Sequence, residues 1–137
     1  MLRIIAQILF ATETFALLSM ANVPVAPPEK QTPRLAIAEQ VCNLGEVNDK
    51  KPVRTVRFIV LNVGSETLII NDAATSCGCV TVKHPKCPIE PGETDTIEVT
   101  YDGTAQSYGK FKKTITIFSN DPRKFTRIFI MGSRSVE

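Results

Sequence analysis

The sequence lacks the features that nucleic-acid binding and histidine-rich metal sites require. It has no tryptophan, one histidine (His84) and no block of like charge, because 16 Lys and Arg are balanced by 14 Asp and Glu to give a net charge of +2. Nucleic-acid binders gather cations on one surface, whereas the basic residues here are scattered along the chain. A single imidazole leaves no second histidine ligand for a metal. We therefore expect no nucleic-acid partner.

Common catalytic motifs are also missing. No serine lies in a G-x-S-x-G turn, and the 7 glycines are isolated, so no glycine-rich phosphate loop is present. The acidic residues fall mostly in turns or at outward positions of predicted strands, where carboxylates are ordinarily solvated. The sequence therefore predicts a protein that is not an enzyme and holds no cofactor.

No apolar run is long enough to span a membrane. Residues 4–21 are mostly apolar, but Glu13 interrupts them, and an acid in the middle of a bilayer costs about 3 kcal/mol. Arg3 supplies a basic start, and Ser19 and Ala21 place small residues where a signal peptidase cleaves. We predict that residues 1–21 are a signal peptide, that the protein is secreted or periplasmic, and that the mature chain has no membrane span.

The remaining chain divides into a spacer, one domain and a tail. Residues 22–33 contain four of the 9 prolines and are expected to form an extended spacer. Residues 34–132 form the predicted domain, and residues 133–137 a short polar tail. One domain is what a chain of 137 residues accommodates.

Within the domain the apolar residues alternate with a period of two, as in strands with one buried face. Turn residues that contain Gly, Pro, Asn and Asp separate these runs. About seven short strands of this kind predict an all-β fold, a single immunoglobulin-like antiparallel β-sandwich. The clearest strands are residues 35–38, 53–62, 67–71, 94–102, 111–119 and 125–131.

An ordered set of short motifs resembles a known family. The set comprises NLGEV at 43–47, FIVLNVG at 58–64, SCGCV at 76–80, PIEPGE at 88–93 and SNDP at 119–122. Over residues 35–132 these resemble the bacterial secreted domain-of-unknown-function family fifteen-seventy-three, which is similar to the Hydin-like (ASH) and major-sperm-protein immunoglobulin-like domains. The resemblance implies a β-sandwich and an extracytoplasmic location, and it implies no reaction.

The four cysteines, Cys42, Cys77, Cys79 and Cys87, are all disulfide candidates in a secreted chain. A bridge from Cys77 to Cys79 closes three residues and contributes about 1.5 kcal/mol, whereas one from Cys42 to Cys87 closes 46 residues and contributes about 4 kcal/mol. Buried free thiols and a reactive thiol are the other interpretations.

The same segment allows a metal-site hypothesis. Cys77, Cys79, His84 and Cys87 follow the spacing C-x-C-x4-H-x2-C, and thiolates with one imidazole suit Zn(II) or Cu(I). The usual zinc spacing is C-x2-C, so the match is weak. A thiol-disulfide redox protein, or one that handles Zn or Cu through the Cys-Gly-Cys motif, is therefore the alternative to our main functional hypothesis.

The main hypothesis comes from the last two predicted strands, in which both faces are apolar. If Ile115, Ile117, Ile128 and Ile130 face the core, then large apolar side chains must face outward, where a one-sided sheet needs none. The alternatives are a register shifted by one residue, or a spacer or C-terminal tail that folds over this face. We predict a non-catalytic module that binds a protein, an envelope component or a second copy of itself through Ile69, Phe118, Phe125, Phe129 and Met131.

Export is directly testable. Because Ser19 and Ala21 mark the predicted cleavage site, N-terminal sequencing of the exported protein should begin at Asn22. A cytoplasmic protein that keeps Met1 would contradict the signal peptide and remove the oxidising environment that disulfides need.

Overall fold

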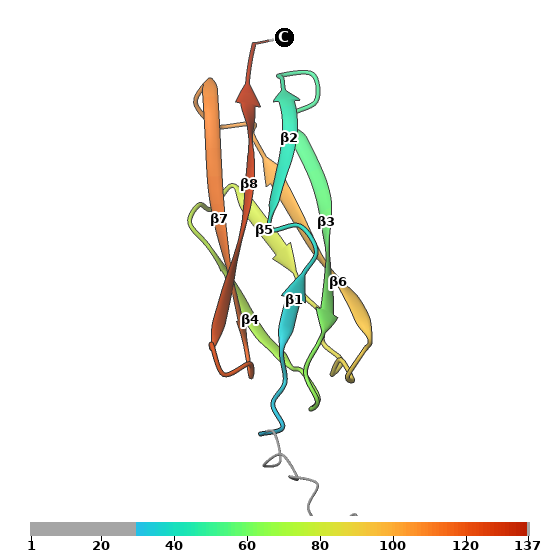
Figure 1. Cartoon of the computed structure of the whole chain (residues 1–137). Coiled ribbons are helices and arrows are strands. Elements are labelled where there is room, and N and C mark those ends of the chain that lie inside the picture. The colour runs from blue at the N-terminus through green and yellow to red at the C-terminus, as the bar shows by residue number, and fades with distance from the viewer. Residues whose placement is uncertain (1–29, 137) are drawn as a thin grey trace, which may run out of the picture.

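The computed structural model describes residues 30–136, so the predicted signal peptide and most of the spacer lie outside the described residues. This part of the chain contains eight strands (Figure 1). They are β1 (Leu35–Ile37), β2 (Val41–Val47), β3 (Val53–Asn62), β4 (Ile70–Thr75), β5 (Val80–Lys83), β6 (Thr94–Asp102), β7 (Gly109–Ser119) and β8 (Phe125–Arg134).

The strands form two four-stranded sheets, ordered β1-β3-β6-β5 and β2-β8-β7-β4, which confirms the predicted immunoglobulin-like sandwich. All pairings are antiparallel except that of β2 with β8, which is parallel. The prediction of a purely antiparallel sandwich is wrong at this one pair. A parallel partner distant in the chain leaves no signature in local alternation, and β2 was not among the strands predicted.

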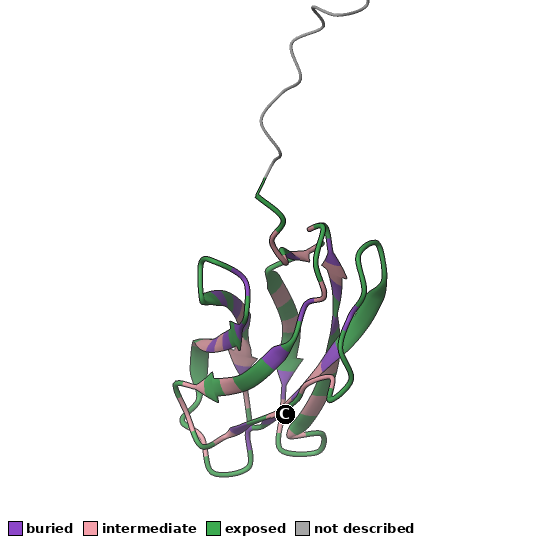
Figure 2. Cartoon of the chain, turned by 90° about the horizontal axis from the view of Figure 1, so that it is seen from below, coloured by how far each residue is buried: buried purple, intermediate pink, exposed green. Residues whose placement is uncertain are grey.

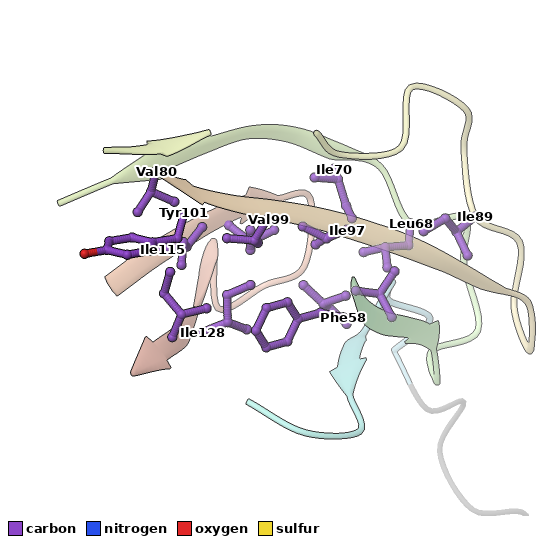
Figure 3. Packing of buried hydrophobic residues seen from close by; sticks show 14 of the residues in the cluster. Phe58, Leu68, Ile70, Val80, Ile89, Ile97, Val99, Tyr101, Ile115 and Ile128 are labelled. Atoms are coloured by element: carbon purple, nitrogen blue, oxygen red, sulfur yellow. The ribbon is translucent and has the colours of Figure 1, made fainter. Parts of the chain in front are cut away.

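The core fills the space between the sheets, as the alternation predicted. Ile115, Ile117, Ile128 and Ile130 are all fully buried and contribute from one sheet. Buried and exposed positions alternate along the strands (Figure 2). Each such side chain stabilises the fold by about 2 kcal/mol through removal from water. The other sheet contributes Phe58, Val60, Ile97, Val99 and Tyr101, several of which are labelled in Figure 3.

The chain crosses from one sheet to the other at both edges of the sandwich. Ala38 and Gln40 belong to the crossover between β1 and β2. Ala38 N–H donates to Ile59 C=O on β3 of one sheet, and Gln40 C=O accepts from Phe129 N–H on β8 of the other. Between β4 and β5, Ser76 N–H donates to Thr114 C=O, and Asp102 N–H donates to Cys79 C=O. Each crossover is therefore hydrogen-bonded to both sheets, which satisfies backbone groups that leave a ladder.

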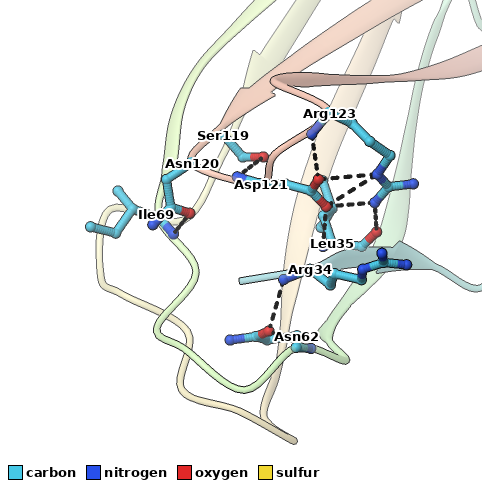
Figure 4. A network of polar contacts seen from close by, with 9 residues as sticks. Arg34, Leu35, Asn62, Ile69, Ser119, Asn120, Asp121 and Arg123 are labelled. Atoms are coloured by element: carbon cyan, nitrogen blue, oxygen red, sulfur yellow. Dashed lines mark hydrogen bonds and ion pairs between the residues drawn. The ribbon is translucent and has the colours of Figure 1, made fainter. Parts of the chain in front are cut away.

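One end of the sandwich is closed by the buried carboxylate of Asp121, in the turn between β7 and β8 (Figure 4). Leu35 N–H, at the start of β1, donates to Asp121 Oδ2 at 2.8 Å. Arg123 Nη2 donates both to Asp121 Oδ2 at 2.6 Å and to Leu35 C=O at 2.5 Å. These hydrogen bonds from Arg123, with those from the backbone, hold the pKa of Asp121 at about 2, against burial, which acts to raise it. The carboxylate thus joins the two sheets.

Two asparagine side chains hold the loops at the same end. Asn120 Oδ1 accepts from Ile69 N–H at 2.8 Å, and its Nδ2 donates to Thr67 C=O at 3.0 Å. Asn62 is fully buried; its Nδ2 donates to Ile89 C=O at 2.9 Å, and its Oδ1 accepts from Gly64 N–H at 2.9 Å. Both residues belong to the motifs on which the family resemblance rests, so those motifs have a structural role.

We predict that Asp121→Asn lowers the free energy of unfolding by about 2 kcal/mol at pH 7. The pKa of Asp121 is depressed in the folded protein, from 3.8 to about 2, so its contribution is present above pH 4 and is lost as the pH falls toward 2. Urea denaturation at several pH values should show a flatter loss of stability between pH 4 and pH 2 in the variant. Asp95→Asn, at an exposed position of β6, is the control and should leave that loss unchanged.

Candidate functional site

The outer face of the β2-β8-β7-β4 sheet carries large apolar side chains. Phe118 on β7 lies opposite Phe125 on β8, and Phe129 on β8 lies between Thr114 of β7 and Val41 of β2. Exposed fractions reach 44% for Phe125, 38% for Met131 and 38% for Phe118, while Phe129 is half-buried. We call the set Val41, Phe118, Phe125, Phe129 and Met131 the apolar face.

The structure places four of the five predicted surface residues on this face. The fifth, Ile69, immediately precedes β4; its side chain is 43% exposed and points away from the Asp121 network (Figure 4). Val41 was missed, because the alternation around it is weak and β2 was not predicted. Only its pairing with Phe129 shows that it extends the face.

Cationic side chains lie over the aromatic rings of this face. Lys112 Nζ lies 4.6 Å from the centroid of the Phe129 ring, and Arg127 Cζ lies 5.0 Å from that of Phe125. Both cations are exposed, and such contacts contribute about 0.5–1 kcal/mol each at a solvated site. The apolar face is therefore interspersed with positive charge.

A hollow of about 380 Å³ opens at one end of the apolar face, beside Met131 and Lys110. Two of its lining residues, Gly45 and Gly132, lack side chains. Gly45 has φ +72° at an irregularity between β2 and β8, a conformation that favours glycine. A Cβ at Gly132 would lie 2.8 Å from both Gly45 C=O and the Phe111 ring, so the close approach of the strands requires glycine there.

The outer face of the β1-β3-β6-β5 sheet is different in character. Thr55 and Thr100 hydrogen-bond through their hydroxyls at 3.0 Å, and Arg57 Nε lies 3.4 Å from Glu98 Oε2. Lys83 lies opposite Glu98 on the next strand. Exposed Val53 and Ile59 also lie on this face, but they are six residues apart on β3, about 20 Å, and scattered apolar side chains of this kind are ordinary at a surface. Clustered aromatic side chains are therefore found on only one of the two outer sheet faces within residues 30–136.

Cys77 and Cys79 form a disulfide at the crossover from β4 to β5, with Cα atoms 5.2 Å apart. Cys79 packs against the core, and its N–H donates to Cys77 Sγ at 3.3 Å. The bond therefore fixes the corner at which the chain changes sheets.

The longer candidate bridge does not form, because Cys42 and Cys87 are both free. Cys42 lies on β2 opposite Ile130, whereas Cys87 is exposed in the loop after β5, which belongs to the other sheet. The entropy that a disulfide removes from the unfolded chain depends on the length of the loop it closes, and not on where the two cysteines lie in the folded protein.

The hypothesised metal site is not assembled either. Cys77 and Cys79 are bonded to each other, and His84 Nδ1 lies 3.1 Å from Pro85 C=O. Within residues 30–136, no group of three or more His, Cys, Asp or Glu residues is placed to hold a metal ion. The C-x-C-x4-H-x2-C spacing therefore does not correspond to a ligand set in three dimensions.

A partly buried ion pair, which sequence reasoning missed, lies at the end of the sandwich where β8 finishes. Arg134 is buried and its Nη2 lies 2.7 Å from Asp49 Oδ1, while Tyr108 O–H donates to Asp49 Oδ2 at 3.0 Å. The hydrogen bond to Asp49 raises the pKa of Tyr108. Arg134 was assigned to a polar tail, yet β8 continues through it.

Within residues 30–136, no helix is long and apolar enough to cross a membrane.

Residues 35–133 match the family model described as protein of unknown function (DUF1573), and the chain belongs to that family. This confirms the resemblance to family fifteen-seventy-three. No curated protein matches the chain.

Solved structures support the immunoglobulin-like fold. A protein of unknown function from Porphyromonas gingivalis W83 is similar with a TM-score of 0.67 and 20% identity, over 82% of this chain and 51% of that one. The ASH/PapD-like domain 7 of human CEP192 has a TM-score of 0.62 at 6% identity, over 82% and 94%. The periplasmic chaperone SfaE has a TM-score of 0.55 at 9% identity, over 74% and 58%. The chain thus spans about half the length of the Porphyromonas protein, and at these identities the likeness concerns the fold.

The cysteine arrangement predicts two reactive thiols in the denatured, unreduced protein, Cys42 and Cys87, and four after reduction. Alkylation followed by peptide mass analysis measures both numbers and identifies the residues. Four alkylated thiols before reduction, or a label on Cys77 or Cys79, would contradict the disulfide.

Proposed function

We propose that this protein is a non-catalytic, extracytoplasmic binding module that docks a protein or another envelope component on its apolar face. The observation that carries the proposal is the contrast between the two sheets. One outer face carries threonines, paired charges and two separated aliphatic side chains, whereas the other presents the larger side chains of Phe118, Phe125 and Met131 to solvent. The core lies between the sheets, and the outer face of the first sheet has no cluster of aromatic side chains. Folding of the sandwich therefore does not require such a cluster on the outer face of the second sheet.

Leaving these side chains in water is unfavourable. Each exposed large apolar side chain forgoes about 2 kcal/mol that burial would provide, and adjacent ones promote aggregation. A partner that covers them recovers this free energy. The cations over Phe125 and Phe129 keep the uncovered face hydrated, which fits a surface that is free part of the time.

Three observations support an extracytoplasmic location. The first residues have the pattern of a signal peptide, the disulfide at Cys77 and Cys79 suits an oxidising compartment, and the fold is shared with a periplasmic chaperone. The fold is also that of a chaperone, and a chaperone acts on other proteins, which supports a role in protein binding.

Photo-crosslinking in intact cells tests the surface. A photoreactive amino acid at position 125 or 131, on the apolar face, should give discrete adducts with one component, and Phe129→Ser introduced alongside should weaken them. The same probe at position 59, on the polar sheet and 58% exposed, should give none. Adducts only from position 59, or none from any position, would contradict the proposal.

Adjacent residues on β8 separate binding from folding. Phe129→Ser should leave the fold intact, because this side chain lies on the outer face. Ile128→Ser, at a fully buried position, should lower the free energy of unfolding by about 4 kcal/mol, because it leaves a cavity and buries a hydroxyl. Thermal melts that show the reverse would mean that the proposed surface is core.

The cysteine pair gives a second control. A binding module should still give its adduct when Cys77 and Cys79 are both replaced by Ser, with a loss of stability only, whereas a thiol-disulfide protein should lose its function.

A further inference from the structure

We propose that the partner presents to the apolar face a peptide segment that combines carboxylates with large apolar side chains. This inference rests on the proposed function and names the chemistry of its partner. It follows from the charges on the face, from their lack of partners and from the hollow at its end.

The outward side chains of β7 and β8 include three cations, Lys110, Lys112 and Arg127, all exposed. Within residues 30–136, none of the three forms an ion pair with a carboxylate. Lys112 and Arg127 lie instead over aromatic rings. A carboxylate could therefore pair with either cation without breaking an existing ion pair.

The carboxylates on this face, Glu46 and Asp72, lie on the two edge strands β2 and β4. Glu46 accepts a hydrogen bond from Ser135 Oγ, and Asp72, on the edge strand β4, accepts from Ala73 N–H at 2.8 Å. Both carboxylates keep their charge, but the three cations lie on the central strands β7 and β8, so the middle of the face carries the positive charge. A partner with acidic residues gains attraction there, and a basic partner is repelled.

The apolar side chains along β8 set the spacing of the partner's own residues. Phe125, Phe129 and Met131 all project outward from one strand, on which alternate residues lie about 6.8 Å apart. Met131 also borders the hollow of about 380 Å³, which is large enough to receive an apolar side chain, and Lys110 lies at the same hollow. An apolar side chain in the hollow would thus place a neighbouring carboxylate within reach of Lys110.

The same charges disfavour a second copy as the occupant. In a two-fold dimer built on this face, each protomer would present its unpaired cations to those of the other. Burial of like charges is costly, so a dissimilar, acidic partner fits better than self-association.

Selection from a random peptide library against the purified protein tests the partner's chemistry. The selected peptides should be enriched in Asp and Glu together with Phe, Leu or Ile, relative to the starting library. One such peptide, measured by calorimetry, should bind about tenfold more weakly to the double variant Lys110→Glu/Lys112→Glu and more weakly at 0.5 M than at 0.05 M salt. The matched control Lys83→Glu, an exposed lysine on the polar sheet, should bind as the native protein does.

The outcomes distinguish the two proposals. Neutral or basic peptides that lose binding on Phe125→Ser would overturn the acidic partner and leave the binding face in place. Peptides that are insensitive both to Phe125→Ser and to the Lys110 and Lys112 reversals would overturn both proposals. An absence of enrichment would overturn the acidic segment, and a dimer in sedimentation that Phe129→Ser abolishes would replace it with a second copy.

Discussion

The sandwich depends on the buried carboxylate of Asp121. It accepts hydrogen bonds from Leu35 in one sheet and from Arg123 beside the β7–β8 turn of the other. Two sheets packed through apolar side chains alone can slide, because the hydrophobic effect has no direction. Hydrogen bonds to a buried charge do have direction, and an unpaired buried carboxylate is costly, so this contact sets how the β7–β8 hairpin sits over the core.

The position of that hairpin determines the surface of the protein. With Ile115, Ile117, Ile128 and Ile130 held in the core, the strand period of two directs Phe118, Phe125, Phe129 and Met131 outward. β2 then adds Val41 to the face because it runs beside β8. The binding face is thus a consequence of the same register that builds the core, and both would be lost together if the register shifted by one residue.

The glycines of the β2–β8 pair add local shape to this surface. Gly132 lets β8 pass close to Gly45 and Phe111, and Gly45 adopts a left-handed conformation where the ladder is irregular. Both glycines line the hollow beside Met131 and Lys110. This face therefore has a concave position, next to a cation, at the Met131 end of its apolar row.

The sequence by itself determined the features that depend on neighbours in the chain. The alternation at 53–62 and 94–102 defined β3 and β6 to the residue, and the alternation at 111–119 and 125–131 identified the hairpin and its two apolar faces, because side-chain direction in a strand follows from local geometry. A disulfide between Cys77 and Cys79 could be considered from the sequence for the same reason, because the two residues are only two positions apart.

Tertiary structure alone decided what depends on residues far apart in sequence. The parallel pairing of β2 with β8, the free state of Cys42 and Cys87, and the burial of Arg134 against Asp49 all arise from how the two sheets close over each other. Local patterns of charge, spacing and hydrophobicity carry no record of these contacts, because each joins elements that only the folded chain brings together.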